Sequence, residues 1–295
     1  MNRILVVTLG GTICSANKGD TIKLGAALDR SFFDKFKSNA EFSFLTPVLY
    51  SSENANEDLF RKALSAIIKE CEGNKPDGIL ILHGTDSMAY FAQLAVRVLS
   101  YLNLPVVITG SKLPPEDSHS DAVKNVKYAL GLLNAAADGR LGSITFGVVF
   151  SDSLMGDTTF IPAIRVTDAN FEGDYGKFPG KPSVDTLTKD EAKAYLESPL
   201  KKMITIPAIP GFPYDAIKLN DIDTVLIEGY HSGTASTIGL PELVEAAVKS
   251  SRKVYIAPVH SGKVQYESNK VLEEKGAKAI YNMPFEGCWA ESLIR

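Results

Sequence analysis

The segment GILILHGTDSMAYFAQLAVRVLSYLNLPVVIT spans residues 78–109 and carries the clearest fold signal in the chain. The apolar run Gly78 to Leu82 has the length of a buried strand, and a second such run extends from Leu104 to Thr109. Between them, Ser87 to Leu102 repeats apolar side chains at helical spacing, and Asp86 stands where a helix N-cap is expected. A strand, a helix and a strand in this order predict a parallel sheet.

The same alternation extends towards the N-terminus and beyond residue 109. Further strands are predicted at Ile4 to Thr8 and Ser143 to Phe150, and further helices at Glu57 to Glu70 and Asp121 to Ala136. Each helix follows a loop that follows a strand. The first half of the chain is therefore predicted to be an α/β domain with a flavodoxin-like parallel sheet.

The composition shifts between Asn170 and Lys202, where glycines and prolines stand among charged and polar residues. This segment also holds a short predicted helix around Lys189 to Leu196. Beyond it the alternation resumes, which predicts a smaller second α/β domain. The predicted organisation is an N-terminal domain at 1–172, a linker at 173–202 and a C-terminal domain at 203–295. The second domain's strands are predicted at Met203 to Ala208, Thr224 to Glu228, Val254 to Val259 and Ala279 to Tyr281, and its helices at Pro241 to Ser250 and Glu267 to Lys275.

Composition narrows the classes of partner and compartment. The 295 residues include 31 Lys+Arg and 35 Asp+Glu without long runs of one sign, so a nucleic acid or membrane partner is not expected and a small molecule is favoured. The three cysteines are isolated, so neither a disulfide framework nor a metal site is predicted, and no cofactor is expected. The apolar stretch before Gly10 is too short for a signal peptide, which predicts a cytoplasmic protein.

Ligands of open parallel sheets gather outside the carboxyl ends of the strands, so the loops that follow the strands are the candidate site. After the first strand comes Thr8-Leu9-Gly10-Gly11-Thr12-Ile13, in which paired glycines allow a tight turn and leave Thr12 exposed. A plain turn and a phosphate-binding loop are the alternatives. A phosphate loop would need a third glycine or a Gly-Lys-Ser/Thr ending, and the segment has neither.

After the strand Gly78 to Leu82 comes His83-Gly84-Thr85-Asp86-Ser87-Met88, a second turn that carries a hydroxyl and, beside it, a carboxylate. The alternative is that Asp86 or Ser87 only caps the following helix. His83 is interpreted as a structural residue rather than a general base.

At these two turns the sequence resembles the bacterial-type L-asparaginases and glutaminases, which carry a Thr-Gly-Gly-Thr-Ile turn and a His-Gly-Thr-Asp-Thr-Met turn in this order. The resemblance is closer to the cytoplasmic type I branch and covers nearly the whole chain. Further agreement lies at Ser51 to Asn54, which follow a strand expected to end near Leu49, at 107–111, at Ser120-Asp121, and in the second domain at 229–234 and 261–264.

The resemblance implies hydrolysis of L-asparagine, and of L-glutamine as a second amide, through an acyl-enzyme. It makes Thr12 the nucleophile and Thr85 the second threonine beside the scissile amide. Asp86, with Ser52 and Glu53, is implied to clamp the α-amino and α-carboxylate groups of the substrate. It also implies a homodimer or homotetramer. The substrate-binding residues expected on this basis are Gly11, Ser51, Ser52, Glu53 and Ser111.

The sequence departs from the family pattern at the two groups usually invoked to activate the threonines. The first group is a tyrosine in the loop after the first threonine, and the position that should hold it corresponds here to Ile22 or Lys23. The second is a lysine behind the Thr-Asp turn, and the stretch 156–165, where it is expected, has no lysine. Arg165, Lys112 and, in the loop after Thr12, Lys18 or Lys23 are the remaining candidates for a charge or activating partner, although an ion pair for Arg165 and ordinary solvated side chains for the lysines are the alternative. This departure keeps a second function open, an amino-acid-binding or regulatory protein with weak catalysis.

Overall fold

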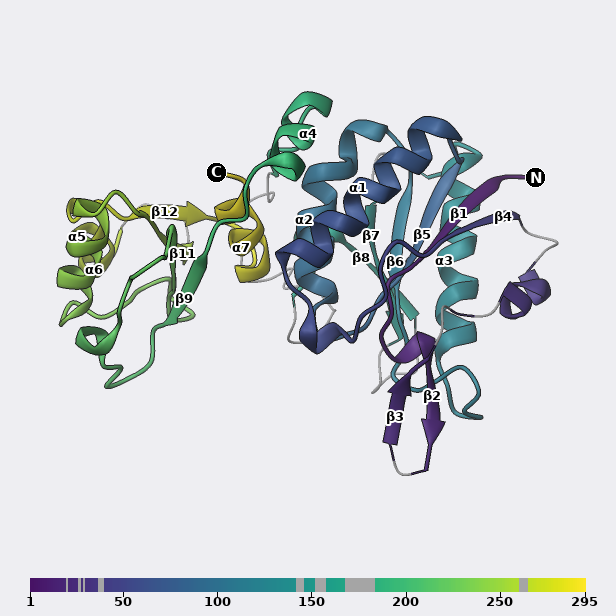
Figure 1. Ribbon diagram of the computed structural model, residues 1–295, viewed down its shortest axis with the longest axis horizontal. Coiled ribbons are helices and arrows are strands. Elements are labelled where there is room, and N and C mark those ends of the chain that lie inside the picture. The colour runs from purple at the N-terminus through teal and green to yellow at the C-terminus, as the bar shows by residue number, and fades with distance from the viewer. Residues whose placement is uncertain are drawn as a thin grey trace. The chain divides into compact units, whose positions relative to one another are not determined.

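The computed structural model describes residues 1–295 except 20, 26–27, 29, 37–39, 142–145, 152–157, 168–183 and 260–264. The chain forms two compact units (Figure 1). Unit 1 holds the described residues of Met1–Gly173 and Val184–Ser198, and unit 2 holds those of Pro199–Arg295. Of the predicted linker at 173–202, Val184–Ser198 therefore belongs to unit 1 and the last four residues, 199–202, belong to unit 2.

Unit 1 is built on a six-stranded sheet in the order β4-β1-β5-β6-β7-β8. All neighbouring strands are parallel except β8, which pairs antiparallel with β7. Numbered along the chain, the five parallel strands have the order 2-1-3-4-5 of flavodoxin-like sheets, so the predicted fold class is confirmed, with an antiparallel edge strand added. The strands are β1 Arg3–Thr8, β4 Glu41–Leu45, β5 Gly78–Leu82, β6 Val106–Thr109, β7 Phe146–Ser151 and β8 Thr158–Pro162.

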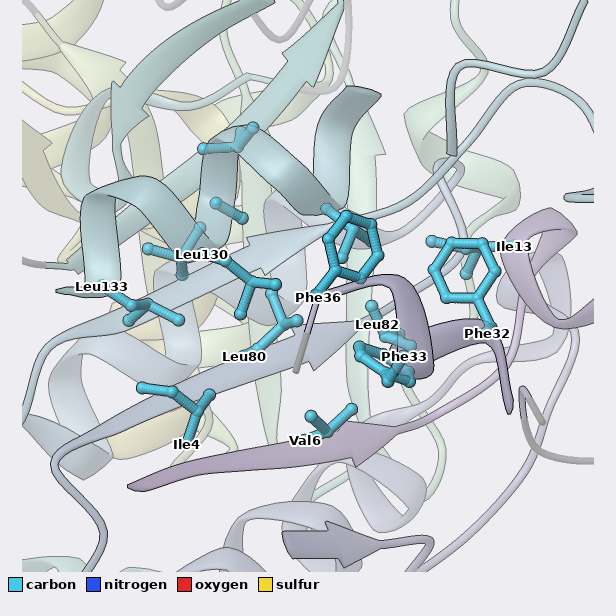
Figure 2. Packing of buried hydrophobic residues seen from close by; sticks show 14 of the residues in the cluster. Ile4, Val6, Ile13, Phe32, Phe33, Phe36, Leu80, Leu82, Leu130 and Leu133 are labelled. Atoms are coloured by element: carbon cyan, nitrogen blue, oxygen red, sulfur yellow. The ribbon is translucent and has the colours of Figure 1, made fainter. Parts of the chain in front are cut away.

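The core of unit 1 fills both faces of this sheet. Every residue of β5 is buried, as expected for a parallel strand that is covered on two sides. On one face, apolar side chains of β1 and β5 pack against α3 (Ala122–Ala137) and the phenylalanines of η2 (Arg30–Phe36), as Figure 2 shows. The helices α1 and α2 lie on the other face (Figure 1). The remaining helices of unit 1 are α1 Glu57–Gly73, α2 Met88–Leu99 and α4 Lys189–Glu197, with short 3-10 helices η1 Thr12–Cys14, η3 Ser52–Asn54, η4 Ser100–Leu102 and η5 Ala163–Arg165.

Some boundaries differ from the sequence prediction for local reasons. The strand expected to end near Leu49 is β4, which ends at Leu45, before Pro47, a residue that cannot donate a ladder hydrogen bond. The helix expected to reach Leu102 changes at Ser100 from α2 into the 3-10 turn η4. Residues 143–145 of one predicted strand lie outside the described residues. The loop after Thr12 forms an antiparallel hairpin, β2 Ser15–Lys18 and β3 Thr21–Leu24.

Unit 2 is a smaller α/β unit, as predicted. Its four strands are all parallel, in the order β12-β11-β10-β9. Side chains of α5 and α6 pack in one apolar cluster of this unit, and side chains of α7, a helix missed by the sequence prediction, pack in another. Within the described ranges, no helix combines the length and apolar character needed to cross a membrane. The elements are β9 Met203–Pro207, β10 Thr224–Glu228, β11 Lys253–Val259, β12 Lys278–Tyr281, α5 Leu240–Lys249, α6 Glu267–Glu274 and α7 Phe285–Ile294, with η6 Tyr214–Ala216.

Candidate active site

The candidate site lies in unit 1, where the strand order reverses. The chain leaves β1, passes to β4 on one side and returns to β5 on the other, so the loops after these three strands share one edge of the sheet. The backbone joins them directly: Leu9 N–H donates to Leu82 O (2.9 Å), and Tyr50 N–H donates to Leu9 O (3.0 Å). This switch point is where open parallel sheets bind their ligands.

The two threonine turns meet at their glycines. Gly11 has a φ of 78°, and a Cβ added there would stand 2.1 Å from Gly84 Cα. A Cβ added at Gly10, with a φ of 120°, would stand 2.0 Å from Tyr50 O. Only residues without a side chain allow this approach. The backbones that lead into Thr12 and Thr85 are therefore in contact, although the two residues are far apart in the sequence.

The Ser-Glu loop after β4 joins the second turn through side chains. Ser52 Oγ donates to Asp86 Oδ2 (2.8 Å), and Ser87 Oγ donates to Ser52 O (2.7 Å). Ser52 is buried, whereas Asp86 and Glu53 are exposed, and Thr12 and Thr85 are half-buried. The hydroxyl of Ser52 thus holds one carboxylate oxygen of Asp86 while the carboxylate faces solvent.

The interpretation of Asp86 as a helix cap is wrong. Ser87 is the N-cap of α2, and no side chain caps that helix. The carboxylate of Asp86 instead accepts the hydrogen bond from Ser52, on a different loop. The side chain of Asp86 is therefore positioned by the loop after β4 and not by α2.

His83 is a structural residue behind the second turn. Its side chain is fully buried, and Phe60, Phe91 and Tyr50 surround it. Its Nδ1 lies 2.7 Å from Gly84 O, which can only accept, so Nδ1 carries the proton and Nε2 accepts from the Tyr50 hydroxyl at 2.9 Å. Burial lowers the pKa of His83 to about 4, so the ring stays neutral at pH 7.

This hydrogen bond also orients a backbone donor. The carbonyl of Gly84 points inward to His83, and in a trans peptide the following N–H points the opposite way. The N–H of Thr85 is therefore directed out of the core, and it has no acceptor among the described residues. An outward N–H beside a half-buried threonine is the kind of group that stabilises an oxyanion.

The loop after β6 approaches the same edge. A Cβ added at Gly110 would stand 2.4 Å from His83 O. The next residue, Ser111, is buried, and its hydroxyl donates within its own loop to Leu113 O (2.7 Å). The side chain of Lys112 lies over the ring of Phe150, with the ammonium 5.5 Å from the ring centroid.

The other predicted residues lie around this centre. Ser51 flanks Ser52 and is half-buried. Arg165 belongs to η5, which packs against α2, where Gln93 Nε2 donates to Val166 O (3.3 Å). The motif residues 261–264 of unit 2 and residues 156–157 fall outside the described residues. No cluster of three His, Cys, Asp or Glu side chains that would hold a metal ion is found in the described part.

Two contributors were missed by the sequence reasoning. The hydroxyl of Tyr50 hydrogen-bonds to the ring of His83, and the hydroxyl of Ser87 donates to the backbone carbonyl of Ser52. The signal for Tyr50 was its place directly before the Ser51-Ser52 motif, at the end of a strand-like segment. The hairpin that follows Thr12 is tied to the first turn, because Ser15 Oγ donates to Gly11 O (2.9 Å).

Comparison with known proteins gives one family. A family model described as Asparaginase, N-terminal matches residues 3–164, more than half of the chain. Over 100 residues the chain is 36% identical to L-asparaginase 1 of Escherichia coli (strain K12), a stretch that covers 34% of this chain and 28% of that protein. Over 144 residues it is 30% identical to a glutamyl-tRNA(Gln) amidotransferase component of Saccharolobus islandicus, covering 48% of this chain and 32% of that protein. These matches span about a third of each relative's length.

Solved structures resemble the chain over nearly its full length. The thermostable L-asparaginase from Thermococcus kodakarensis aligns with a TM-score of 0.71 at 20% identity, covering 99% of this chain and 92% of that one. A probable cytoplasmic L-asparaginase from Campylobacter jejuni aligns with a TM-score of 0.71 at 18% identity, covering 99% and 94%. At this identity the likeness concerns the fold.

Proposed function

The chain belongs to the asparaginase family, and from that premise we propose that it hydrolyses L-asparagine to L-aspartate and ammonia, with Thr12 as the nucleophile. The observation that carries the proposal is the contact between Gly11 and Gly84, which brings the two threonine turns together at the switch point of the sheet. Asp86, held by Ser52, stands at the same place.

In this proposal the site divides the work between binding and chemistry. The exposed carboxylate of Asp86 takes the α-ammonium of the substrate, while the hydroxyl of Ser52 and the loop around Glu53 orient the α-amino and α-carboxylate groups. Ser51, Gly11 and Ser111 complete the list of proposed binding residues. A carboxylate that keeps one oxygen on Ser52 retains lone pairs for a cationic ligand.

The chemical step is attack by the Thr12 hydroxyl on the side-chain amide carbon. The outward N–H of Thr85 is the proposed donor to the oxyanion, an interaction worth about 3 kcal/mol of barrier by analogy with measured oxyanion holes. Collapse of the intermediate breaks the carbon–nitrogen bond, and the departing nitrogen takes a proton to leave as ammonia. Water then hydrolyses the acyl-enzyme ester and regenerates the Thr12 hydroxyl.

The group that accepts the proton of the Thr12 hydroxyl is the part of the site that differs most from the family pattern. Arg165 stays protonated at any ordinary pH, so its proposed role is limited to holding a negative charge. Lys112, another basic candidate, lies against Phe150. The hairpin after Thr12 carries Ile22 and Lys23 on β3 and has no tyrosine. This last observation favours one second candidate, an amino-acid-binding or regulatory protein of the same fold with weak catalysis.

Ammonia release separates the two candidates. Purified protein is given L-asparagine and L-glutamine side by side, and the ammonia formed is measured against a buffer blank. The proposal predicts release from asparagine at a rate well above the blank. Release from neither amide, together with calorimetric binding of aspartate, would favour the binding protein instead.

Assembly and location are proposed on the same premise. We propose a homodimer or homotetramer, to be tested by light scattering, which would show a monomer if the proposal is wrong. A reducing compartment such as the cytoplasm fits the three cysteines Cys14, Cys71 and Cys288, which are all buried free thiols. Fractionation of the native host tests the location.

A further inference from the structure

The helix α4 lies against α1 in the antiparallel direction, and polar contacts join the two helices at both ends of α4. At the far end, Lys189 at the start of α4 pairs with Glu72 near the end of α1 (2.5 Å). At the near end, residues at the close of α4 contact the first turns of α1. Only the near end lies beside the candidate site, because α1 begins five residues after Ser52.

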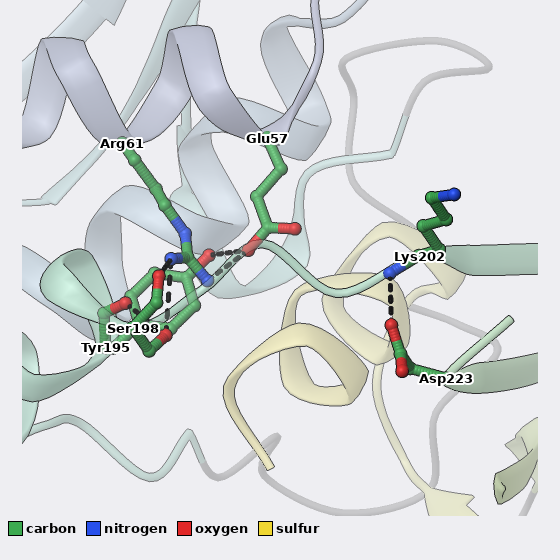
Figure 3. Close-up of polar contacts among 6 residues, drawn as sticks. All are labelled: Glu57, Arg61, Tyr195, Ser198, Lys202 and Asp223. Atoms are coloured by element: carbon green, nitrogen blue, oxygen red, sulfur yellow. Dashed lines mark hydrogen bonds and ion pairs between the residues drawn. The ribbon is translucent and has the colours of Figure 1, made fainter. Parts of the chain in front are cut away.

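The near end is a set of polar contacts around a buried arginine, which Figure 3 shows. The side chain of Arg61 is only 5% exposed and forms an ion pair with Glu57 Oε1 (2.5 Å). The same guanidinium donates to Ser198 O (2.6 Å) and Oγ (3.2 Å), and it lies 4.2 Å above the ring of Tyr195. The hydroxyl of Tyr195 donates to Glu57 Oε1 (3.0 Å), so the carboxylate is held by both helices.

The geometry of this network depends on the particular side chains that form it. Taking two charges out of water is unfavourable unless they are paired, and the planar guanidinium of Arg61 meets Glu57 and Ser198 in one fixed orientation, with its Nε left without a hydrogen-bond partner among the described residues. Four contacts on Arg61 therefore fix where α4 ends and where α1 begins.

The first turn of α1 connects this network with the loop of Ser52 and Glu53. Glu57 is the first residue of α1, and Ala55 N–H, two residues earlier, donates to Ser52 O (3.2 Å). On the inner side of the same turn, the ring of Phe60 lies 6.0 Å from that of His83, behind the Thr85 turn. The turn is thus held between α4 and the aromatic group that supports the second threonine.

We propose that Glu57, Arg61 and Tyr195 form a positioning latch, through which α4 holds the first turn of α1 and sets Ser52 and Glu53 for the α-amino and α-carboxylate groups of the substrate. The inference rests on the proposed function. These three residues do not touch the substrate in this arrangement, so they act through the loop. Because the loop binds groups that do not react, loosening the latch removes binding that ground state and transition state share. The expected result is a higher KM with little change in kcat.

The latch is tested by kinetics of variants at the two ends of α4. Tyr195→Phe removes one hydroxyl and keeps the ring under Arg61, so it is expected to fold, and it should raise KM for asparagine about threefold to tenfold with kcat within about twofold of wild type. Arg61→Lys, which keeps the charge and loses the planar fork, should raise KM further. The matched control is Glu72→Gln, which breaks the tie at the far end between two exposed side chains and should leave KM unchanged.

Melting temperatures and calorimetric titration with L-aspartate accompany the kinetics. A merely structural role would lower the melting temperature of Tyr195→Phe and leave KM and aspartate affinity as in wild type, which would overturn the latch. If wild type binds aspartate without turnover, the proposed catalysis fails and the latch is judged on whether Tyr195→Phe weakens that binding. A wild-type protein that neither binds nor turns over would overturn the inference together with the function on which it rests.

Discussion

Gly84 is the position where the smallest change tests the geometry of the site most sharply. In the proposed site the two threonine turns work because their glycines touch. Replacing Gly84 with alanine adds one methyl group, which would stand 2.4 Å from Ser52 Oγ, 2.5 Å from Ser52 Cβ and 2.9 Å from Gly11 Cα. The methyl group therefore presses on the loop of Ser52 and on the first threonine turn at once.

The size of the effect follows from these distances. Ordinary contact between such atoms begins at 3.4 Å, so Ser52 Cβ and the new methyl group must separate by about 0.9 Å. Overpacking of this kind costs about 1 to 3 kcal/mol of the free energy of unfolding. A displacement near 1 Å in a catalytic arrangement lowers the rate about a hundredfold. We expect Gly84→Ala to lower kcat/KM for asparagine by about that factor.

The assay is ammonia release combined with a thermal melt, and the chain offers a matched control. Gly131 lies within α3, is exposed, and has no atom within 4 Å of an added Cβ. Gly131→Ala should keep full activity and raise stability by up to about 1 kcal/mol, because alanine favours the helix. A Gly84→Ala protein with kcat/KM within about threefold of wild type would refute the reasoning that close contact of the turns is required.

Three further outcomes follow from single residues. Asp86→Asn keeps the shape and loses the charge proposed to receive the α-ammonium, so KM for asparagine should rise about tenfold to a hundredfold, and unchanged KM would remove Asp86 from the proposed clamp. The pKa of His83 is lowered to about 4 in the folded protein, so between pH 6.5 and 4 the unfolded chain binds a proton that the folded chain does not. Urea melts should therefore show the free energy of unfolding falling by up to about 3 kcal/mol as the pH drops from 6.5 to 4. In His83→Asn this free energy should depend less on pH. Burial raises the pKa of Cys14 to about 12 and that of Cys71 to about 11, so a thiol reagent at pH 7 should label neither until the protein is unfolded, and rapid labelling of the native protein would contradict their burial.

The sequence predicted the strands and helices best where burial is complete. β5 and β10 begin and end where expected, because buried parallel strands are continuous apolar runs with sharp polar ends. The hairpin β2–β3 was predicted as a loop, since its residues are mostly exposed and carry no apolar periodicity. The helix α7 was missed because it is apolar on most sides and lacks an amphipathic pattern.

The sequence pointed to the loops that form the candidate site, but not to most of the contacts between them. The glycine pair pointed to a close approach near Thr12, but nothing in the sequence named Gly84 as the neighbour. The bond between Ser52 and Asp86 joins residues 34 positions apart, and local reasoning gave Asp86 to the nearest helix instead. Long-range side-chain contacts are decided by strand order, which local patterns leave open. The roles of the site residues remain predictions to be tested by substitution.

In the proposed reaction the Thr12 hydroxyl attacks the amide, so Thr12→Ala removes the nucleophile itself. The change removes one hydroxyl from a half-buried residue that follows the fixed Gly11 turn. The variant should melt near the wild-type temperature and bind asparagine in calorimetry, while its ammonia release falls at least about a thousandfold. A Thr12→Ala protein that keeps a tenth or more of the wild-type rate would show that another group is the nucleophile.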